Sequence, residues 1–88
     1  MKTFILDGYQ FKTRNDAFEY LNSVFQFPDY FGKNLDSLWD VLSDLKDIRI
    51  EIINARQIPK HLQGYGLKIL DIFGDLNGYK GVEVEMLW

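Results

Sequence analysis

The spacing of hydrophobic residues along the chain predicts three strands. Residues 3–6 are nearly all apolar and end at Asp7 and Gly8, a strong turn signal, which indicates a buried strand. Apolar and charged side chains alternate over residues 48–52 and again over residues 81–87, a pattern typical of half-buried strands. The intervals between these three segments carry a different, helical spacing.

Two helices are predicted between the first two strands. Apolar residues at positions 17, 18, 21, 24 and 25 indicate a helix over residues 14–24, with Thr13 as its capping residue. A loop over residues 27–33 follows, because proline and glycine interrupt regular structure there. A second helix is predicted over residues 34–44, and Asn34 is a good residue to begin it.

The interval between the second and third strands is less regular. Residues 54–62 indicate a short helical or irregular stretch, which Pro59 limits. Residues 67–76 carry the broad apolar face of a further helix, for which Gly78 is a plausible terminator.

Strands separated by helical segments pair in parallel through right-handed crossovers. A strand covered on both faces is apolar throughout, whereas an alternating strand has a more exposed position. The nearly continuous first strand is therefore predicted to lie in the middle of the sheet, in the order 2-1-3. The expected fold is an α/β domain in which about four helices pack on a three-stranded parallel sheet.

The composition indicates one folded domain over residues 1–88. Hydrophobic residues make up 47% and aromatic residues 16% of the chain, more than a disordered segment carries. The absence of cysteine excludes disulfides and thiolate metal ligands. The apolar run near the N-terminus is too short for a signal peptide or a membrane span, so we expect a cytoplasmic protein without membrane contact.

The net charge of −3 is concentrated in one part of the chain. Between residues 29 and 47 there are five aspartates and two lysines, whereas the remaining eight acidic and eight basic residues balance. An acidic surface repels nucleic-acid phosphates and attracts basic proteins. The sequence therefore disfavours direct nucleic-acid binding and favours a basic protein partner.

Three of these aspartates are spaced to form a stripe on the second predicted helix. Asp36, Asp40 and Asp44 follow one another at intervals of four residues, on an arc separate from the apolar positions. Like charges at this spacing weaken an isolated helix by about 0.2–0.5 kcal/mol per pair, so helix stability does not explain them. From the stripe alone, a solvated face is the more common explanation, and a partner that supplies cations is the alternative.

The sequence offers no catalytic or metal-binding constellation. His61 is the only histidine, and no triad or metal-ligand partner accompanies it. Residues 64–66 lack the ending of a phosphate-binding loop. Asp36 and Asp40 could form a hydrolase pair, but one short helix offers no pocket. We therefore expect neither enzymatic activity nor a cofactor or metal, and an acidic-site hydrolase remains only a third alternative.

A longer motif gives the acidic segment a more specific meaning. Residues 28–40 have the sequence PDYFGKNLDSLWD and match every fixed position of P-x-Y-[YF]-G-x-N-x-D-[AS]-L-W-D, the signature of the barstar family. The order of the predicted elements also resembles that of the family along about the whole chain. The resemblance implies an inhibitor of a basic, extracellular-type ribonuclease like barnase, which protects the producing cell from its own nuclease in the manner of an immunity protein.

The resemblance also implies that Tyr30, Asp36, Trp39 and Asp40 face the nuclease. Asp40 would take the place of a substrate phosphate among arginine and histidine side chains, because bidentate arginine pairs accept either anion. The residues alone leave alternatives open. Tyr30 could equally plug an edge of the core, and Trp39 lies on the boundary between the apolar and acidic arcs.

Three further positions complete the predicted partner-binding set. Asn34 matches the motif, although helix capping explains it equally well. Asp44 is nearer the helix end, at the expected rim of the interface. Asp75 corresponds to an acidic contact that the family carries on its fourth helix, with a shorter side chain than the usual glutamate. The free protein is expected to be a monomer, and the alternative function is a non-inhibitory interaction module that uses the same acidic surface on another basic partner.

Overall fold

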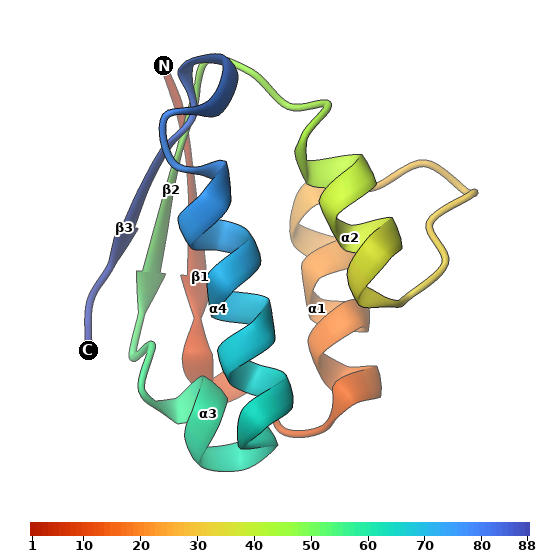
Figure 1. Ribbon diagram of the computed structural model, residues 1–88, viewed down its shortest axis with the longest axis vertical. Coiled ribbons are helices and arrows are strands. Elements are labelled where there is room, and N and C mark those ends of the chain that lie inside the picture. The colour runs from red at the N-terminus through yellow and green to blue at the C-terminus, as the bar shows by residue number, and fades with distance from the viewer.

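A three-stranded parallel sheet forms one side of the molecule. In the computed structural model, which describes residues 1–88, the strands are β1 (Lys2–Asp7), β2 (Ile48–Ile53) and β3 (Glu83–Met86) (Figure 1). Helical segments connect them, as parallel pairing requires. The predicted class, a parallel three-stranded α/β fold, is confirmed.

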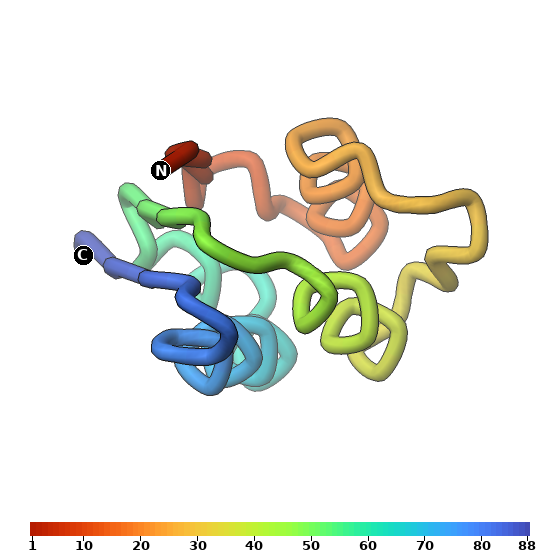
Figure 2. Tube along the Cα trace, turned by 90° about the horizontal axis from the view of Figure 1, so that it is seen from above, coloured from red at the N-terminus to blue at the C-terminus, as the bar shows by residue number.

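The strand order is β1-β2-β3, with β2 in the centre, so the predicted order 2-1-3 is wrong. That prediction assumed that helices cover both faces of the sheet, but they cover only one (Figure 2). On the open face Ile5 is 55% exposed, in register with Glu51 and Glu85. The apolar run of β1 therefore includes an isoleucine that faces solvent. The alternation of apolar and charged residues in β2 arises because one face of the sheet is open, although β2 is the central strand.

Four α-helices and two single 3-10 turns connect the strands, and the predicted number of about four helices is confirmed. Their bounds are η1 (Gly8–Gln10), α1 (Arg14–Phe25), α2 (Leu35–Leu42), α3 (Gln57–Leu62), α4 (Gly64–Leu76) and η2 (Tyr79–Gly81). Thr13 begins α1, because its hydroxyl oxygen accepts a hydrogen bond from the Asp16 N–H at 3.0 Å.

Helix α2 is shorter than predicted and ends at Leu42. Ser43 follows as its C-cap, and the Leu45 N–H donates to the Leu42 carbonyl oxygen at 3.0 Å in a tight turn. This turn redirects the chain toward β2. Asp44 therefore lies in the turn and not on the helix, so the predicted three-aspartate helical stripe contains only Asp36 and Asp40.

Helix α4 begins three residues earlier than predicted. Gly66 is buried where α4 meets α3, and a Cβ atom at this position would lie 2.6 Å from the Ile58 carbonyl oxygen. Glycine thus permits close packing of the two helices instead of interrupting α4. Pro59 is tolerated in the first turn of α3, since the N–H groups there have no partner within the helix.

The hydrophobic core lies between the covered face of the sheet and the helices. Fully buried side chains come from β1 and β2 and from α1, α2 and α4, including Leu6, Ile50, Ile52, Leu21, Leu38, Leu42, Ile69 and Phe73. Burial of such a side chain contributes about 1.5–3 kcal/mol. Helix α2 is thereby held on the molecule by its apolar side, which leaves its other side exposed. No helix has the length and apolar character needed to cross a membrane.

Candidate docking site

Hydrogen bonds between the first turn of α2 and the preceding loop fix the start of this helix. Asn34 Oδ1 accepts a hydrogen bond from the Ser37 N–H at 2.8 Å, so Asn34 is the N-cap, as predicted. The Asn34 side-chain amide donates to the Gly32 carbonyl oxygen at 3.3 Å, and the Gly32 N–H donates to Ser37 Oγ at 2.7 Å. The side chain of Asn34 is therefore engaged in the fold of the free protein.

The loop before α2 presents Tyr30 to solvent. The Phe31 N–H donates to the Pro28 carbonyl oxygen at 3.0 Å and closes a turn with Asp29 and Tyr30 at its corners. Phe31 is 9% exposed and anchors the loop, whereas Tyr30 is 67% exposed. Tyr30 therefore does not pack at an edge of the core, which was one of the two alternatives, and its ring is available to a partner.

A series of aromatic contacts holds this loop in place. The ring centroids of Phe31 and Phe27 are 4.8 Å apart, and Phe27 stacks on Phe25 at 5.4 Å with an interplanar angle of 13°. Phe25 in turn contacts Phe4 of β1 at 4.8 Å. Such pairs contribute about 0.5–1.5 kcal/mol each beyond their buried area. Because the rings connect the loop to the sheet, Tyr30 is positioned before any partner binds.

Trp39 lies between the buried and the acidic sides of α2. Leu38 and Val41 are buried, Asp36 and Asp40 are exposed one turn apart, and Trp39 is half-buried. The Trp39 indole packs against the ring of Tyr79 in η2, with centroids 5.6 Å apart and an interplanar angle of 53°. Trp39 thus packs on the molecule itself and keeps part of its surface exposed beside the two aspartates.

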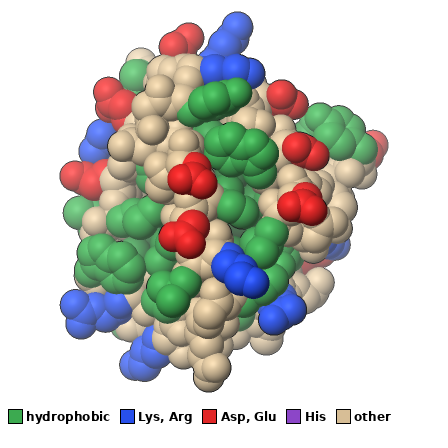
Figure 3. Space-filling view, viewed as in Figure 1, with side chains coloured by type: hydrophobic (Ala, Val, Ile, Leu, Met, Phe, Trp, Pro, Cys, Tyr) green, Lys and Arg blue, Asp and Glu red, His purple; other side chains and the backbone are tan.

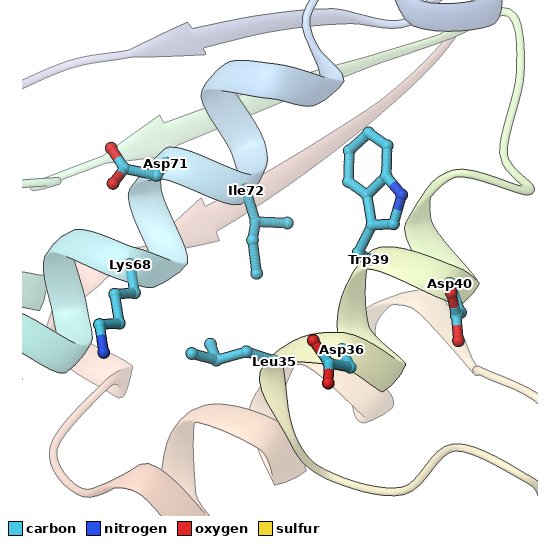
Figure 4. A pocket seen from close by; sticks show the side chains of 7 residues that line it. All are labelled: Leu35, Asp36, Trp39, Asp40, Lys68, Asp71 and Ile72. Carbon is cyan, nitrogen blue, oxygen red and sulfur yellow. The ribbon is translucent and has the colours of Figure 1, made fainter.

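A groove of about 480 Å³ lies between α2 and α4 (Figure 4). Leu35 and Ile72 point into it from the two helices, and Trp39 lies at one end. Asp36 lies at the α2 rim of the groove, and Asp40 lies one turn further along α2 and farther from α4. The full lining consists of Leu35, Asp36, Trp39, Asp40, Lys68, Asp71 and Ile72. An apolar floor is therefore combined with a mainly acidic rim.

The other predicted site residues lie around this groove rather than in it. Tyr30 is in the loop before α2, and Asp44 is exposed in the turn after it. Asp75 is exposed on α4 and lines a second depression instead of the first groove. The structure therefore brings Asp36, Trp39 and Asp40 together at one groove. Tyr30, Asp44 and Asp75 are exposed but do not line this groove.

Negative charge predominates among the side chains of this face, because Lys68 is the only basic residue in the groove lining beside three aspartates. Figure 3 shows acidic groups on both sides of a strip of hydrophobic side chains. None of the site aspartates takes part in an ion pair; the ion pairs join Lys33 to Glu19, and Arg49 to Glu51, Glu83 and Glu85. The hydrogen bond that the Arg49 guanidinium donates to Glu51 is the largest cause of the raised pKa of Arg49. Lys33 and Arg49 thus neutralise glutamates outside the site, and the site aspartates keep their negative electrostatic field.

Four residues around the site were missed by the sequence interpretation. Lys68, Asp71 and Ile72 line the groove from α4, and Tyr79 packs on Trp39. Asp71 precedes Asp75 by one helical turn, so the spacing could have grouped the two. Tyr79 follows Gly78 in an irregular segment, and no local pattern connects it with a tryptophan on another helix.

The side chains of the site can bind a protein through charge, hydrogen bonds and apolar contact. They are carboxylates, an indole, a phenol and an amide. His61 is exposed on α3, and no group of three or more potential metal ligands is close enough together to hold a metal ion. The arrangement is that of a small protein-binding domain, which displays an acidic helix and an ordered aromatic loop on one face.

This domain is of a known type. The chain belongs to the barstar family, described as barstar (barnase inhibitor), whose family model matches residues 1–88. The resemblance based on the motif at residues 28–40 is thereby confirmed. Membership supports a barnase-inhibitor-like role, and it makes a ribonuclease the kind of partner to expect.

A curated relative shares part of the sequence. The chain is 36% identical over 53 residues to the Bacillus subtilis (strain 168) protein named "Putative ribonuclease inhibitor YrdF". The match covers 60% of this chain and 58% of the relative, so it spans less than two thirds of either protein.

Proposed function

We propose that this protein inhibits a basic ribonuclease of the barnase type by occupying its active-site cleft with α2 and the loop over residues 28–33. Family membership supports the partner class. The observation that carries the proposal is the pair Asp36 and Asp40, which are exposed one turn apart beside the half-exposed Trp39 and form no ion pair within the protein. Such a pair matches a cleft that holds several positive charges for RNA.

Asp40 is proposed to replace a substrate phosphate. A nuclease holds phosphate with arginine and histidine side chains, and a carboxylate offers arginine the same bidentate hydrogen bonds. Asp40 is exposed and lies farther from α4 than Asp36 does, so a partner can reach it from solvent (Figure 4). Asp36, near the helix N-terminus, places a second negative charge beside it.

The aromatic residues are proposed to slow dissociation. Tyr30 and Trp39 present aromatic surface on the same loop and helix as the aspartates, and burial of this surface in the complex would exclude water from the charge pairs. Because aromatic contacts already order the loop in the free protein, binding loses little conformational entropy. The free inhibitor acts as a preformed monomer in the cytoplasm and protects the cell without binding RNA or a membrane.

Two double variants with the same change in net charge test this proposal. Asp36→Asn with Asp40→Asn removes the acidic pair of α2, whereas Glu83→Gln with Glu85→Gln removes two charges from the open face of the sheet. Each protein is used to isolate partners from the native host, which are identified by mass spectrometry and tested for ribonuclease activity.

We expect the wild type and the glutamate variant to capture a basic ribonuclease and to inhibit it at equimolar concentration, and the aspartate variant to do neither. Capture of a basic protein whose activity is unaffected would instead support the non-inhibitory interaction module. Turnover of substrate by the purified wild type alone would support the acidic-site hydrolase.

A further inference from the structure

The loop over residues 28–33 ends in a basic residue, Lys33, beside the acidic side chains of the proposed docking site. Lys33 directly precedes Asn34, the N-cap of α2, and Asp36 follows it by three positions. The N-terminus of a helix already carries partial positive charge, so a further cation there is unfavourable. Lysine also has a long, flexible side chain, so an unrestrained ammonium group at this position has Asp36 within its range.

The Lys33 side chain is instead bound to α1. Its ammonium group donates a hydrogen bond to Glu19 Oε1, and the two side chains form an ion pair across fourteen positions of the sequence. No ion pair joins Lys33 to an aspartate. The cation nearest to Asp36 in the sequence is therefore held by a residue outside the loop and α2.

The packing of α1 places Glu19 beside the loop. In Figure 1 the chain leaves the upper end of α1, loops outward and enters α2 at its lower end, alongside α1. Phe18, which precedes Glu19, is buried and contacts Phe31 of the loop, with ring centroids 6.0 Å apart. Two successive residues of α1 thus contact the loop, Phe18 from the core and Glu19 from the surface.

The stability of the fold does not explain this ion pair. The side chains of Lys33 and Glu19 are 47% and 51% exposed, and ion pairs that are this exposed contribute little to the free energy of unfolding. The loop is already anchored by the buried Phe31. What the pair changes is charge, because Lys33 is the only cation in the motif over residues 28–40, whose other charged residues are three aspartates.

We propose that Glu19 is a positioning residue for the docking site: it holds the Lys33 ammonium group on α1, so that this cation neither pairs with Asp36 nor repels the basic partner. The proposal rests on the proposed function and assigns a role in it to α1. A cation released beside α2 would weaken the negative field that speeds the encounter with a basic protein. Removal of the Glu19 charge should therefore slow association.

Three variants test this role. Glu19→Gln releases Lys33, and the double variant Glu19→Gln with Lys33→Gln removes both charges. The matched control is Asp16→Asn, because Asp16 is exposed on α1 one turn before Glu19, lines the same depression and forms no ion pair. It changes the net charge as Glu19→Gln does without releasing a cation. The probe is the ribonuclease captured by the wild-type protein, association rates are measured by stopped flow at low salt, and thermal melts confirm that each variant is folded.

We expect Glu19→Gln to lower the association rate about fivefold, and Asp16→Asn to lower it by less than about twofold. The double variant should return to within about twofold of wild type, because no cation is left to release. If Glu19 only held the loop in place, the double variant would stay as slow as Glu19→Gln. If Glu19→Gln associates as fast as the control, or if the double variant stays slow, while Asp40→Ala fails to inhibit, the positioning role is wrong and the proposed function stands. If the wild type captures no ribonuclease, both proposals fail.

Discussion

The Trp39 indole and the Tyr79 ring pack against each other at 5.6 Å, although forty positions separate them in the sequence. The contact joins α2 to the segment between α4 and β3. Tyr79 remains 42% exposed and Trp39 is half-buried, so the pair adds exposed aromatic surface to the docking face. One contact thus contributes to the fold and positions a residue of the proposed interface.

We predict that Trp39→Ala and Tyr79→Ala are energetically coupled. Each variant should lower the free energy of unfolding, and the coupling energy should be about 0.5–1.5 kcal/mol, because aromatic pairs contribute that much beyond buried area. Urea denaturation of the two single variants and the double variant measures it. The control cycle combines Trp39→Ala with Tyr9→Ala on the distant η1 and should be additive within about 0.5 kcal/mol. If the destabilisations caused by Trp39→Ala and Tyr79→Ala simply add in the double variant, the contact between the two rings does not contribute to stability.

The capping role of Asn34 predicts a specific loss of stability. Asn34→Ala should lower the free energy of unfolding by about 1 kcal/mol, because the N-cap hydrogen bond to the Ser37 N–H is lost. Asn34→Asp should retain stability, since aspartate caps equally well. Thermal and urea unfolding of both variants provide the measurement. An alanine variant as stable as wild type would mean that the cap is not used in solution.

The association rate with the ribonuclease should fall steeply as salt is added, while the dissociation rate changes less. Steering acts over the Debye length, about 10 Å at 0.1 M salt, whereas contacts buried in a complex are weakly screened. Stopped-flow kinetics at several ionic strengths measure both rates. An association rate that does not depend on salt would show that the acidic face is not where the partner docks.

The purified protein should bind RNA no better than a neutral control protein. Its excess charge is negative, and the groove lining holds three aspartates but only one lysine, so the site repels phosphates. Filter binding at low salt, where electrostatic binding is strongest, is the appropriate assay. Saturable binding at micromolar concentration would contradict an inhibitor that acts only on the enzyme.

The sequence predicted element types well, because each depends on local spacing. The caps Thr13 and Asn34 and the helices that follow them were found from a few adjacent residues. The strand order was not, because the apolar run of β1 includes Ile5 on an uncovered face, and hydrophobicity alone cannot show which face a helix covers. The end of α2 was also misplaced, because a tight turn after Leu42 overrides the continuing four-residue spacing of aspartates.

The part of the candidate site that lies in one continuous segment of the sequence could be predicted. The motif placed Asp36, Trp39 and Asp40 on one helix, and the structure brings them to one groove. The α4 side of that groove comes from a distant segment, so its lining required the fold. Tyr79 illustrates the limit, since only the tertiary arrangement places it against Trp39.

The central claim is that Asp40 replaces a substrate phosphate. Asp40→Ala should therefore cost more binding energy than any other single truncation on α2. The variant loses charge-assisted hydrogen bonds and leaves the nuclease cations buried together without a counterion. Such a loss costs roughly 2–5 kcal/mol or more, a range drawn in part from barnase and barstar themselves. Asp44→Ala, in the exposed turn after α2, should cost well under half as much, since exposed pairs contribute about 0–1 kcal/mol.

The most direct measurement is inhibition of the captured ribonuclease by Asp40→Ala and Asp44→Ala, with thermal melts of both variants as the folding control. Folding should be nearly unchanged in both, because Asp40 and Asp44 are exposed and form no ion pair. We expect Asp40→Ala to lose several kcal/mol of binding free energy and therefore most of its inhibition, whereas Asp44→Ala should largely retain inhibition. A folded Asp40→Ala variant that inhibits as well as wild type would contradict the phosphate-replacement mechanism.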